Sequence, residues 1–321
     1  MKENNPNKKK IFIFLGSFCG FLLVSAILVY IFLPSDQENT KEMGPVDITL
    51  EIDNSSLKDD DIRDVQAQSL EIIRNRIKDY GLSGTKIIPE GDDRIQVHFR
   101  RIDDSTAKNL VSSTGKLEIK ILAETEKFMT TVDLINNVLN NPANKIGTSF
   151  QDYFLSFNNG GFIAEENIEA VKKLLDREDI QKQIPRDVVF AFGRGFEKID
   201  RNSLTVKRLF LLKRRAEMGG EDIVDAQAKS VSGSVAVNLR FGGIGPKKFS
   251  AVTAANISKQ MAFVIDNQVI SAPLIMDRIS SGDAMITGPK DMEEAKLLAI
   301  LLRSGAFKVP MKIIETRHGD N

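Results

Sequence analysis

The residues that most resemble a ligand-binding site form a glycine-rich turn at 242–248, which reads GGIGPKK. Backbone N–H groups at such a turn, placed before a helix, can bind phosphate. A Walker loop needs four residues between its first glycine and a Gly-Lys-Ser/Thr ending. Here Pro246 follows the last glycine and Phe249 follows the lysines. We therefore interpret the segment as a strand-to-helix turn.

The other reactive side chains form no catalytic or metal-binding set. Of the two histidines, His98 lies on the polar side of a predicted strand and His318 lies near the C-terminus. The single cysteine, Cys19, lies in an apolar segment, so we predict neither a zinc site nor an internal disulfide. Aspartates 59–61 lack the ligand order of a calcium loop, and there is no Gly-x-Ser-x-Gly elbow. The sequence predicts no enzyme, metal or cofactor.

The elements that could position functional residues begin after residue 45. Alternating apolar and polar residues predict half-buried strands, and a 3.6-residue period predicts helices. The predicted elements are a strand at 46–52, a helix that ends near Tyr80, two strands joined by a turn at 91–93, a helix at 103–111 and a strand at 117–121. Ser55 or Ser56 is the predicted cap of the first helix, and Gly81 its left-handed end. The order βαββαβ is ferredoxin-like.

A similar order returns in the C-terminal third. Its predicted elements are a strand at 235–241, a helix at 246–259, strands at 261–265 and 268–275, a strand at 284–287, a helix at 291–303 and a strand at 311–315. Asp266-Asn267 is the predicted hairpin turn, and Pro273 indicates an edge strand or a bulge. The last strand completes one of the two units, and the pattern does not choose between them. Residues near 124–205 form an insertion of unassigned fold, with a helix predicted near 165–175.

The N-terminal region predicts a membrane anchor. Residues 11–33 contain no charged side chain and are long enough to span a bilayer. Lysines precede this run and acidic residues follow it, which places the N-terminus in the cytoplasm and the rest outside. The alternative is a cleaved signal peptide, but its apolar region would be shorter and would end at small residues. A lipoprotein site at Cys19 is disfavoured by the bulky Phe18 before it.

The remaining sequence is typical of a globular extracytoplasmic part. The formal net charge is +0, so the composition implies no strongly charged partner, and no basic stripe predicts nucleic-acid binding. About 280 residues follow the anchor, which predicts two compact units.

Three stretches resemble the SecD family of protein-export subunits. The longest reads MAFVIDNQVISAP at 261–273 and continues as ITG at 286–288 and LLRSGA at 301–306. The second reads IIRNRI at 72–77 and GDDRI at 91–95, and a weaker third covers residues 210–226. The insertion resembles nothing that we can name.

The resemblance implies an α+β fold with one N-terminal transmembrane helix, a ferredoxin-like base and an α+β head. The implied limits are a cytoplasmic basic tail at 1–10, the transmembrane helix at 11–33, a linker at 34–45, the base at 46–115 and 308–317, and the head at 116–307. The candidate preprotein-contacting or family-motif residues are Asp266, Val269, Ile270, Ser271, Ala272, Pro273, Leu274, Arg303 and Gly305.

The resemblance also implies a function. We expect an auxiliary subunit of Sec-dependent export in the bacterial inner membrane, with SecF, SecYEG and unfolded preproteins as partners. Binding would use strand addition at the Pro273 edge or apolar contact with the head. The chain stops at Asn321, about where the family's second membrane helix would approach, so we expect that it cannot couple to the proton gradient alone.

An alternative hypothesis is a membrane-tethered envelope interaction module that diverged from SecD and left the Sec system. Two observations motivate it. The family's later helices do not follow, and residues 44–47 (GPVD) stand where the family carries an Asp-Gly-Gly stretch. The sequence leaves open whether the chain is a fragment, a split SecD or a free-standing relative.

Overall fold

The computed structural model describes residues 43–319, except 56, 141–148, 158–159, 200–203 and 232. The predicted cytoplasmic tail, the predicted anchor and most of the predicted linker lie outside the described residues. Among the helices that are described, none is long and apolar enough to cross a bilayer.

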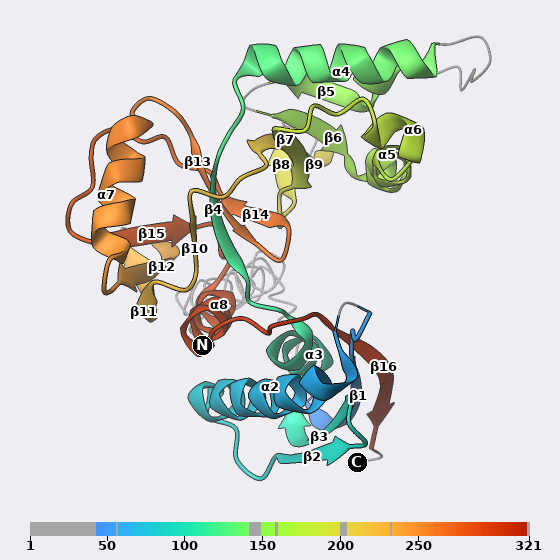
Figure 1. The fold of residues 1–321 in the computed structure, drawn as a ribbon, viewed down its shortest axis with the longest axis vertical. Coiled ribbons are helices and arrows are strands. Elements are labelled where there is room, and N and C mark those ends of the chain that lie inside the picture. The colour runs from blue at the N-terminus through green and yellow to red at the C-terminus, as the bar shows by residue number, and fades with distance from the viewer. Residues whose placement is uncertain are drawn as a thin grey trace, which may run out of the picture. The chain divides into compact units, whose positions relative to one another are not determined.

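A four-stranded antiparallel sheet with two helices forms the unit that we call the base (Figure 1). Its elements are β1 (Gly44–Ile52), α2 (Asp59–Tyr80), β2 (Lys86–Glu90), β3 (Arg94–Ile102), α3 (Asp104–Ser112) and β16 (Met311–His318). The strand order is β16-β1-β3-β2. Alternate residues of β1 are buried, as predicted, and α2 and α3 pack against the same core. Pairing of β1 with β16 assigns the last strand to this unit.

The sequence predicted the C-terminal end of α2 correctly but not its N-terminal cap. Gly81 takes the left-handed conformation (φ 88°) and donates its N–H to Ile77 and Lys78 carbonyls, which confirms the predicted helix end. The predicted serine cap is wrong, because the capping position is Lys58, and among the described residues no side chain caps the helix. Several residues therefore separate Ser55 from the helix start at Asp59.

Two sheets, β10-β4-β13-β14 and β11-β12-β15, form the unit that we call the head. Its elements are β4 (Leu117–Ile121), β10 (Met218–Gly219), β11 (Ile223–Val231), β12 (Ser234–Phe241), α7 (Gly245–Ala255), β13 (Met261–Ile265), β14 (Gln268–Ser271), β15 (Asp283–Thr287) and α8 (Met292–Ser304). The second predicted βαββαβ order is therefore divided between two sheets, and its last strand belongs to the base. The helix at α7 and the strand at β14 also end earlier than predicted.

The insertion folds around a further sheet of order β5-β6-β9-β7, with β8 paired to β9. Its elements are α4 (Thr125–Leu139), η2 (Phe150–Tyr153), β5 (Phe154–Phe157), β6 (Gly161–Ala164), η3 (Glu165–Asn167), α5 (Ile168–Leu175), α6 (Glu178–Gln181), β7 (Val188–Phe192), β8 (Glu197–Ile199) and β9 (Leu204–Lys213). The Phe128 ring lies 5.8 Å from the rings of Phe157 and Phe190 in edge-to-face contact. The helix predicted at 165–175 is confirmed as η3 followed by α5.

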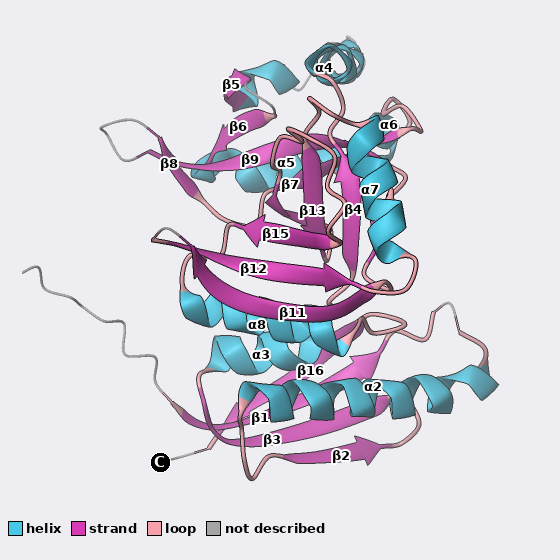
Figure 2. Ribbon diagram, turned by 90° about the vertical axis from the view of Figure 1, so that its left-hand side faces the viewer, coloured by secondary structure: helices cyan, strands magenta, loops and turns pink. Residues whose placement is uncertain are grey.

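Helix α8 contributes to both the base core and the head core. Leu297, Ile300 and Leu301 belong to the base core. Ala295, Leu298, Ala299 and Leu302 belong to the head core. A helix that is apolar on both sides is buried on both sides, and Figure 2 shows α8 between β11 and α3. Residues from Met43 onward accordingly cluster as one compact unit rather than the predicted two.

Candidate peptide-binding surface

The hairpin β13–β14 carries the longest of the motifs found in the sequence. Asp266 and Asn267 both have positive φ (49° and 63°), as a two-residue type I′ turn requires. The predicted turn is therefore confirmed. Strand β13 is buried along its whole length, so the hairpin is anchored in the head.

The Asp266 carboxylate binds the chain segment that leads from the base to the head. Its Oδ2 accepts from the Gly115 N–H (3.2 Å) and its Oδ1 accepts from the Lys116 N–H (3.1 Å). Both bonds satisfy backbone donors of the connection between α3 and β4. This motif residue therefore has a structural role in the hairpin's attachment.

The rest of the hairpin motif is mostly bonded within the chain. Val269 is 2% exposed, and its carbonyl accepts from the Arg194 N–H of the insertion at 2.8 Å. The Pro273 carbonyl accepts from the Met261 N–H at 2.9 Å. Ser271 and Ala272 are partly buried. Few backbone groups near Pro273 therefore remain for an added strand, and contact there would rest on side chains.

Three apolar side chains are exposed where the motif ends. The exposed fractions are 46% for Ile257, 51% for Leu274 and 78% for Met276. Their backbone segments adjoin, because the Ser258 N–H donates to the Ile275 carbonyl at 2.8 Å. Leu274 also lines a hollow of about 330 Å³. We call these three side chains and the hollow the Leu274 surface.

The hollow of the Leu274 surface has an apolar floor and a charged rim. Its apolar lining includes Leu122, Phe128, Phe157 and Leu211. At the rim, Lys259 Nζ lies 3.5 Å from Glu124 Oε1. Exposed apolar groups rimmed by polar ones are typical of protein interaction sites. Ile270, by contrast, packs partly buried against the head core.

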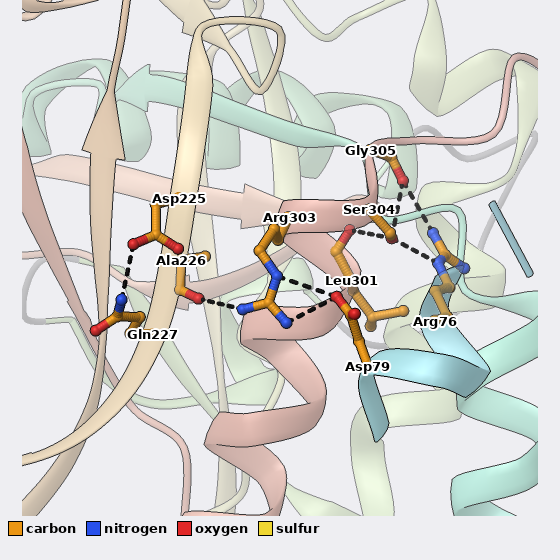
Figure 3. A network of polar contacts seen from close by, with 9 residues as sticks. All are labelled: Arg76, Asp79, Asp225, Ala226, Gln227, Leu301, Arg303, Ser304 and Gly305. Atoms are coloured by element: carbon orange, nitrogen blue, oxygen red, sulfur yellow. Dashed lines mark hydrogen bonds and ion pairs between the residues drawn. The ribbon is translucent and has the colours of Figure 1, made fainter. Parts of the chain in front are cut away.

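The two remaining motif residues, Arg303 and Gly305, lie at the junction of base and head (Figure 3). Arg303 donates from Nε (3.1 Å) and Nη2 (2.7 Å) to Asp79 Oδ2 of α2. Its Nη1 donates to the Ala226 carbonyl of β11 at 3.0 Å. Gly305 has φ 82°, which favours glycine. Neither residue lines the hollow of the Leu274 surface.

Arg76 is the buried centre of this junction, and it was not predicted as a site residue. Its side chain belongs to α2 and is 0% exposed. The guanidinium donates to five oxygen atoms, which are Ser304 Oγ and the carbonyls of Leu110, Ser113, Thr114 and Gly305. Burial lowers the pKa of Arg76 to about 9, and Asp266 opposes that shift, so the group is charged at neutral pH.

The acceptors of Arg76 lie on both connections between base and head. Ser113 and Thr114 belong to the outgoing connection, and Ser304 and Gly305 to the returning one. The guanidinium also lies over the Phe307 ring, with its Cζ 4.3 Å from the ring centroid. In the sequence, Arg76 stands out only as part of the IIRNRI motif, and a basic residue in the closing turn of a helix gives no sign of burial.

Two family models match the chain in these regions. One, described as "SecDF, P1 head subdomain", matches residues 197–309. The other, described as "Protein translocase subunit SecDF, P1 domain, N-terminal", matches residues 66–124. Together they cover just over half of the chain, and both lie outside most of the insertion.

Relatives that are similar to this chain in sequence are SecD proteins. Protein translocase subunit SecD of Syntrophobacter fumaroxidans is 34% identical over 254 residues, covering 78% of this chain and 38% of that protein. SecD of Elusimicrobium minutum is 32% identical over 283 residues, covering 85% of this chain and 51% of that protein. The chain thus spans about half, or less, of the length of these relatives.

The similarity extends to the fold. A structure described as "Structure and function of a membrane component SecDF that enhances protein export" aligns with a TM-score of 0.50 at 24% identity, over 84% of this chain and 99% of that one. SecDF in a "Super-membrane-facing form" aligns with a TM-score of 0.52 at 24% identity, over 96% of this chain and 35% of that one. These matches define a mixed α/β protein of the SecDF P1-domain type. The chain belongs to the SecD family, as its motifs predicted.

Proposed function

We propose that this chain is an auxiliary subunit of Sec-dependent protein export that binds preproteins on the extracytoplasmic side of the inner membrane. The observation that carries the proposal is the Leu274 surface, whose three exposed apolar side chains lie within the region that matches the P1 head model. Unfolded chains expose apolar side chains, so such a patch can hold them without reading their sequence. The relatives' name, protein translocase subunit, supports the same role.

The proposed arrangement in the membrane follows the sequence. Residues 11–33 anchor the chain with its N-terminus in the cytoplasm, and residues 34–45 link the anchor to a ferredoxin-like base. The base comprises 46–115 and 308–317, and the head comprises 116–307. SecF and SecYEG are the proposed partners. Coupling to the proton gradient is assigned to membrane segments other than this single anchor.

Site-specific photocrosslinking tests the proposed contact. A photoreactive amino acid replaces Leu274 in the full-length chain, and a radiolabelled preprotein is arrested during translocation in native membranes. We expect a crosslink from position 274. The matched control is Ile88 of the base, which is 44% exposed against 51% for Leu274. Equal crosslinking from both positions would refute the Leu274 surface as the contact.

A charge at the same position provides the complementary test. Leu274→Asp places a carboxylate on the surface without disturbing the core, whereas Ile270 is packed against that core. We expect a several-fold lower yield of preprotein crosslinked to the head, with unchanged folding by circular dichroism. Unchanged crosslinking by a folded Leu274→Asp protein would contradict the proposal. Recovery of one envelope protein without Sec components would favour the alternative interaction module.

A further inference from the structure

Strand β11 is an edge strand, and part of its backbone faces away from its sheet. The Phe241 N–H of β12 donates to the Gly282 carbonyl on the β15 side at 2.8 Å. Backbone groups alternate sides along a strand, so Leu239 and Val237 also bond toward β15. Their partners in register, Ala226 and Ala228, must therefore turn their N–H and C=O groups away from β12. Along the described chain, no strand pairs with this outer side.

A groove of about 750 Å³ adjoins part of this edge. One wall is β11 from Ala226 to Ala228, and the other walls come from α8 and the C-terminal end of α2. Ala228 is partly exposed, and its small side chain leaves the strand's backbone open to the groove at that position, whereas Ala226 is 0% exposed. The Ala226 carbonyl already has a donor within the chain, because Arg303 Nη1 donates to it at 3.0 Å. Backbone groups for an added strand are therefore available from Ala228 onward.

The chemistry of the groove matches a polypeptide backbone better than a charged or an apolar ligand. Its lining carries acidic and basic side chains together, including Asp79, Lys296 and Arg303. Such a mixture selects no single charge. An unpaired strand edge offers alternating donors and acceptors, which bind an extended chain of any sequence. An extended polypeptide of variable sequence carries no fixed charge and presents the same alternating backbone donors and acceptors, so it suits this groove.

We propose that an extended segment of unfolded polypeptide binds in this groove as an added strand beside β11. The proposal rests on the proposed function and deepens it, because it gives preprotein a second contact with a defined hydrogen-bonding mode. The Leu274 surface supplies apolar contact, and the β11 groove supplies backbone pairing. The added strand would lie at the normal inter-strand spacing of about 4.8 Å from β11, between the head and the base helix α2.

Proline scanning of the two edges of the same sheet tests this proposal. Ala228→Pro removes an N–H that faces the groove, and the sheet tolerates proline there because that N–H is outside its ladder. Met285→Pro is the matched control. It lies on β15, the opposite edge, where Met285 faces outward and is 43% exposed. Circular dichroism checks that both variants remain folded.

The probe is a fluorescein-labelled twelve-residue peptide of alternating threonine and valine, titrated by anisotropy into the full-length protein in detergent. A second version carries N-methyl groups on alternate amides, which prevents strand pairing. We expect Ala228→Pro and the N-methylated peptide each to weaken binding at least about tenfold, as expected for loss of one to two net hydrogen bonds. We expect Met285→Pro to bind like the wild type.

The outcomes separate this inference from the function on which it rests. If the wild type binds the peptide but Ala228→Pro and N-methylation change nothing, the groove proposal fails and peptide binding by the head survives. If no peptide binds the wild type at all, both fail. Light scattering measures the oligomeric state and so tests whether a second copy of the chain, rather than a peptide, occupies the groove. A wild-type dimer that Ala228→Pro dissociates, with no peptide bound, would overturn the proposal.

Discussion

Substitution of Arg76 by lysine is expected to loosen the junction of base and head more than any conservative surface change. Lysine keeps the charge but has three donors, whereas the guanidinium donates to five oxygen atoms. At least two buried acceptors then lose their donor. Each such loss costs about 1–3 kcal/mol, so we expect a decrease of about 2–6 kcal/mol in the free energy of unfolding. Single domains are stable by only about 5–15 kcal/mol.

The control for this substitution is Arg74→Lys, two residues earlier in the same helix. Arg74 is exposed, so its replacement should cost less than about 0.5 kcal/mol. The assay is urea unfolding of the full-length protein in detergent, followed by circular dichroism because the chain has no tryptophan. With a slope of about 1–3 kcal/mol per molar urea, Arg76→Lys should lower the midpoint by about 1 M or more. Equal midpoints for the two variants would refute the assigned role of Arg76.

Three further substitutions test other features by the same unfolding assay. Asn267→Val places a β-branched residue at positive φ (63°) and should cost about 1–3 kcal/mol, whereas an unchanged midpoint would contradict the type I′ turn. Gly161→Ala would bring a Cβ to 2.0 Å from Phe154 Cδ1, so we expect a loss of about 1–3 kcal/mol from overpacking; a neutral result would mean that this ring moves freely. Arg303→Ala removes a partly exposed ion pair with Asp79, in which the side chains are 37% and 32% exposed. We expect a loss of only about 1 kcal/mol, and a loss as large as that of Arg76→Lys would contradict Arg76 as the main link between base and head.

Features governed by neighbouring residues were predictable from the sequence. Alternation identified β1 and β12, because the predicted apolar face of each strand is the more buried one. It also located β4, although Lys120 on the predicted polar face is buried too, so that strand is not half-buried as predicted. The Asp266-Asn267 turn and the Gly81 helix end were predictable because both need residues that tolerate positive φ. The hairpin motif also led to the Leu274 surface, since Leu274 follows its last residues directly. Its status as a contact site remains a prediction.

Features set by distant residues were not predictable. The pairing of β16 with β1 joins strands more than 250 positions apart, and strand alternation is the same whichever partner is chosen. The same ambiguity made the second βαββαβ order look like one sheet. Arg76 shows this most clearly. A charged side chain is normally expected to be exposed, and burial becomes predictable only when the surrounding carbonyls are known. Those carbonyls come from two connections that only the tertiary structure brings together.

The proposed role of this chain is to work with the Sec machinery on preproteins in transit. The most direct measurement is crosslinking of the tagged full-length chain in native membranes, followed by mass spectrometry of the captured proteins. We predict SecF, SecYEG and many different secretory proteins, with the secretory proteins reduced by Leu274→Asp. Capture of a single unrelated envelope protein, with no Sec component, would contradict the claim and support the alternative of an interaction module outside export.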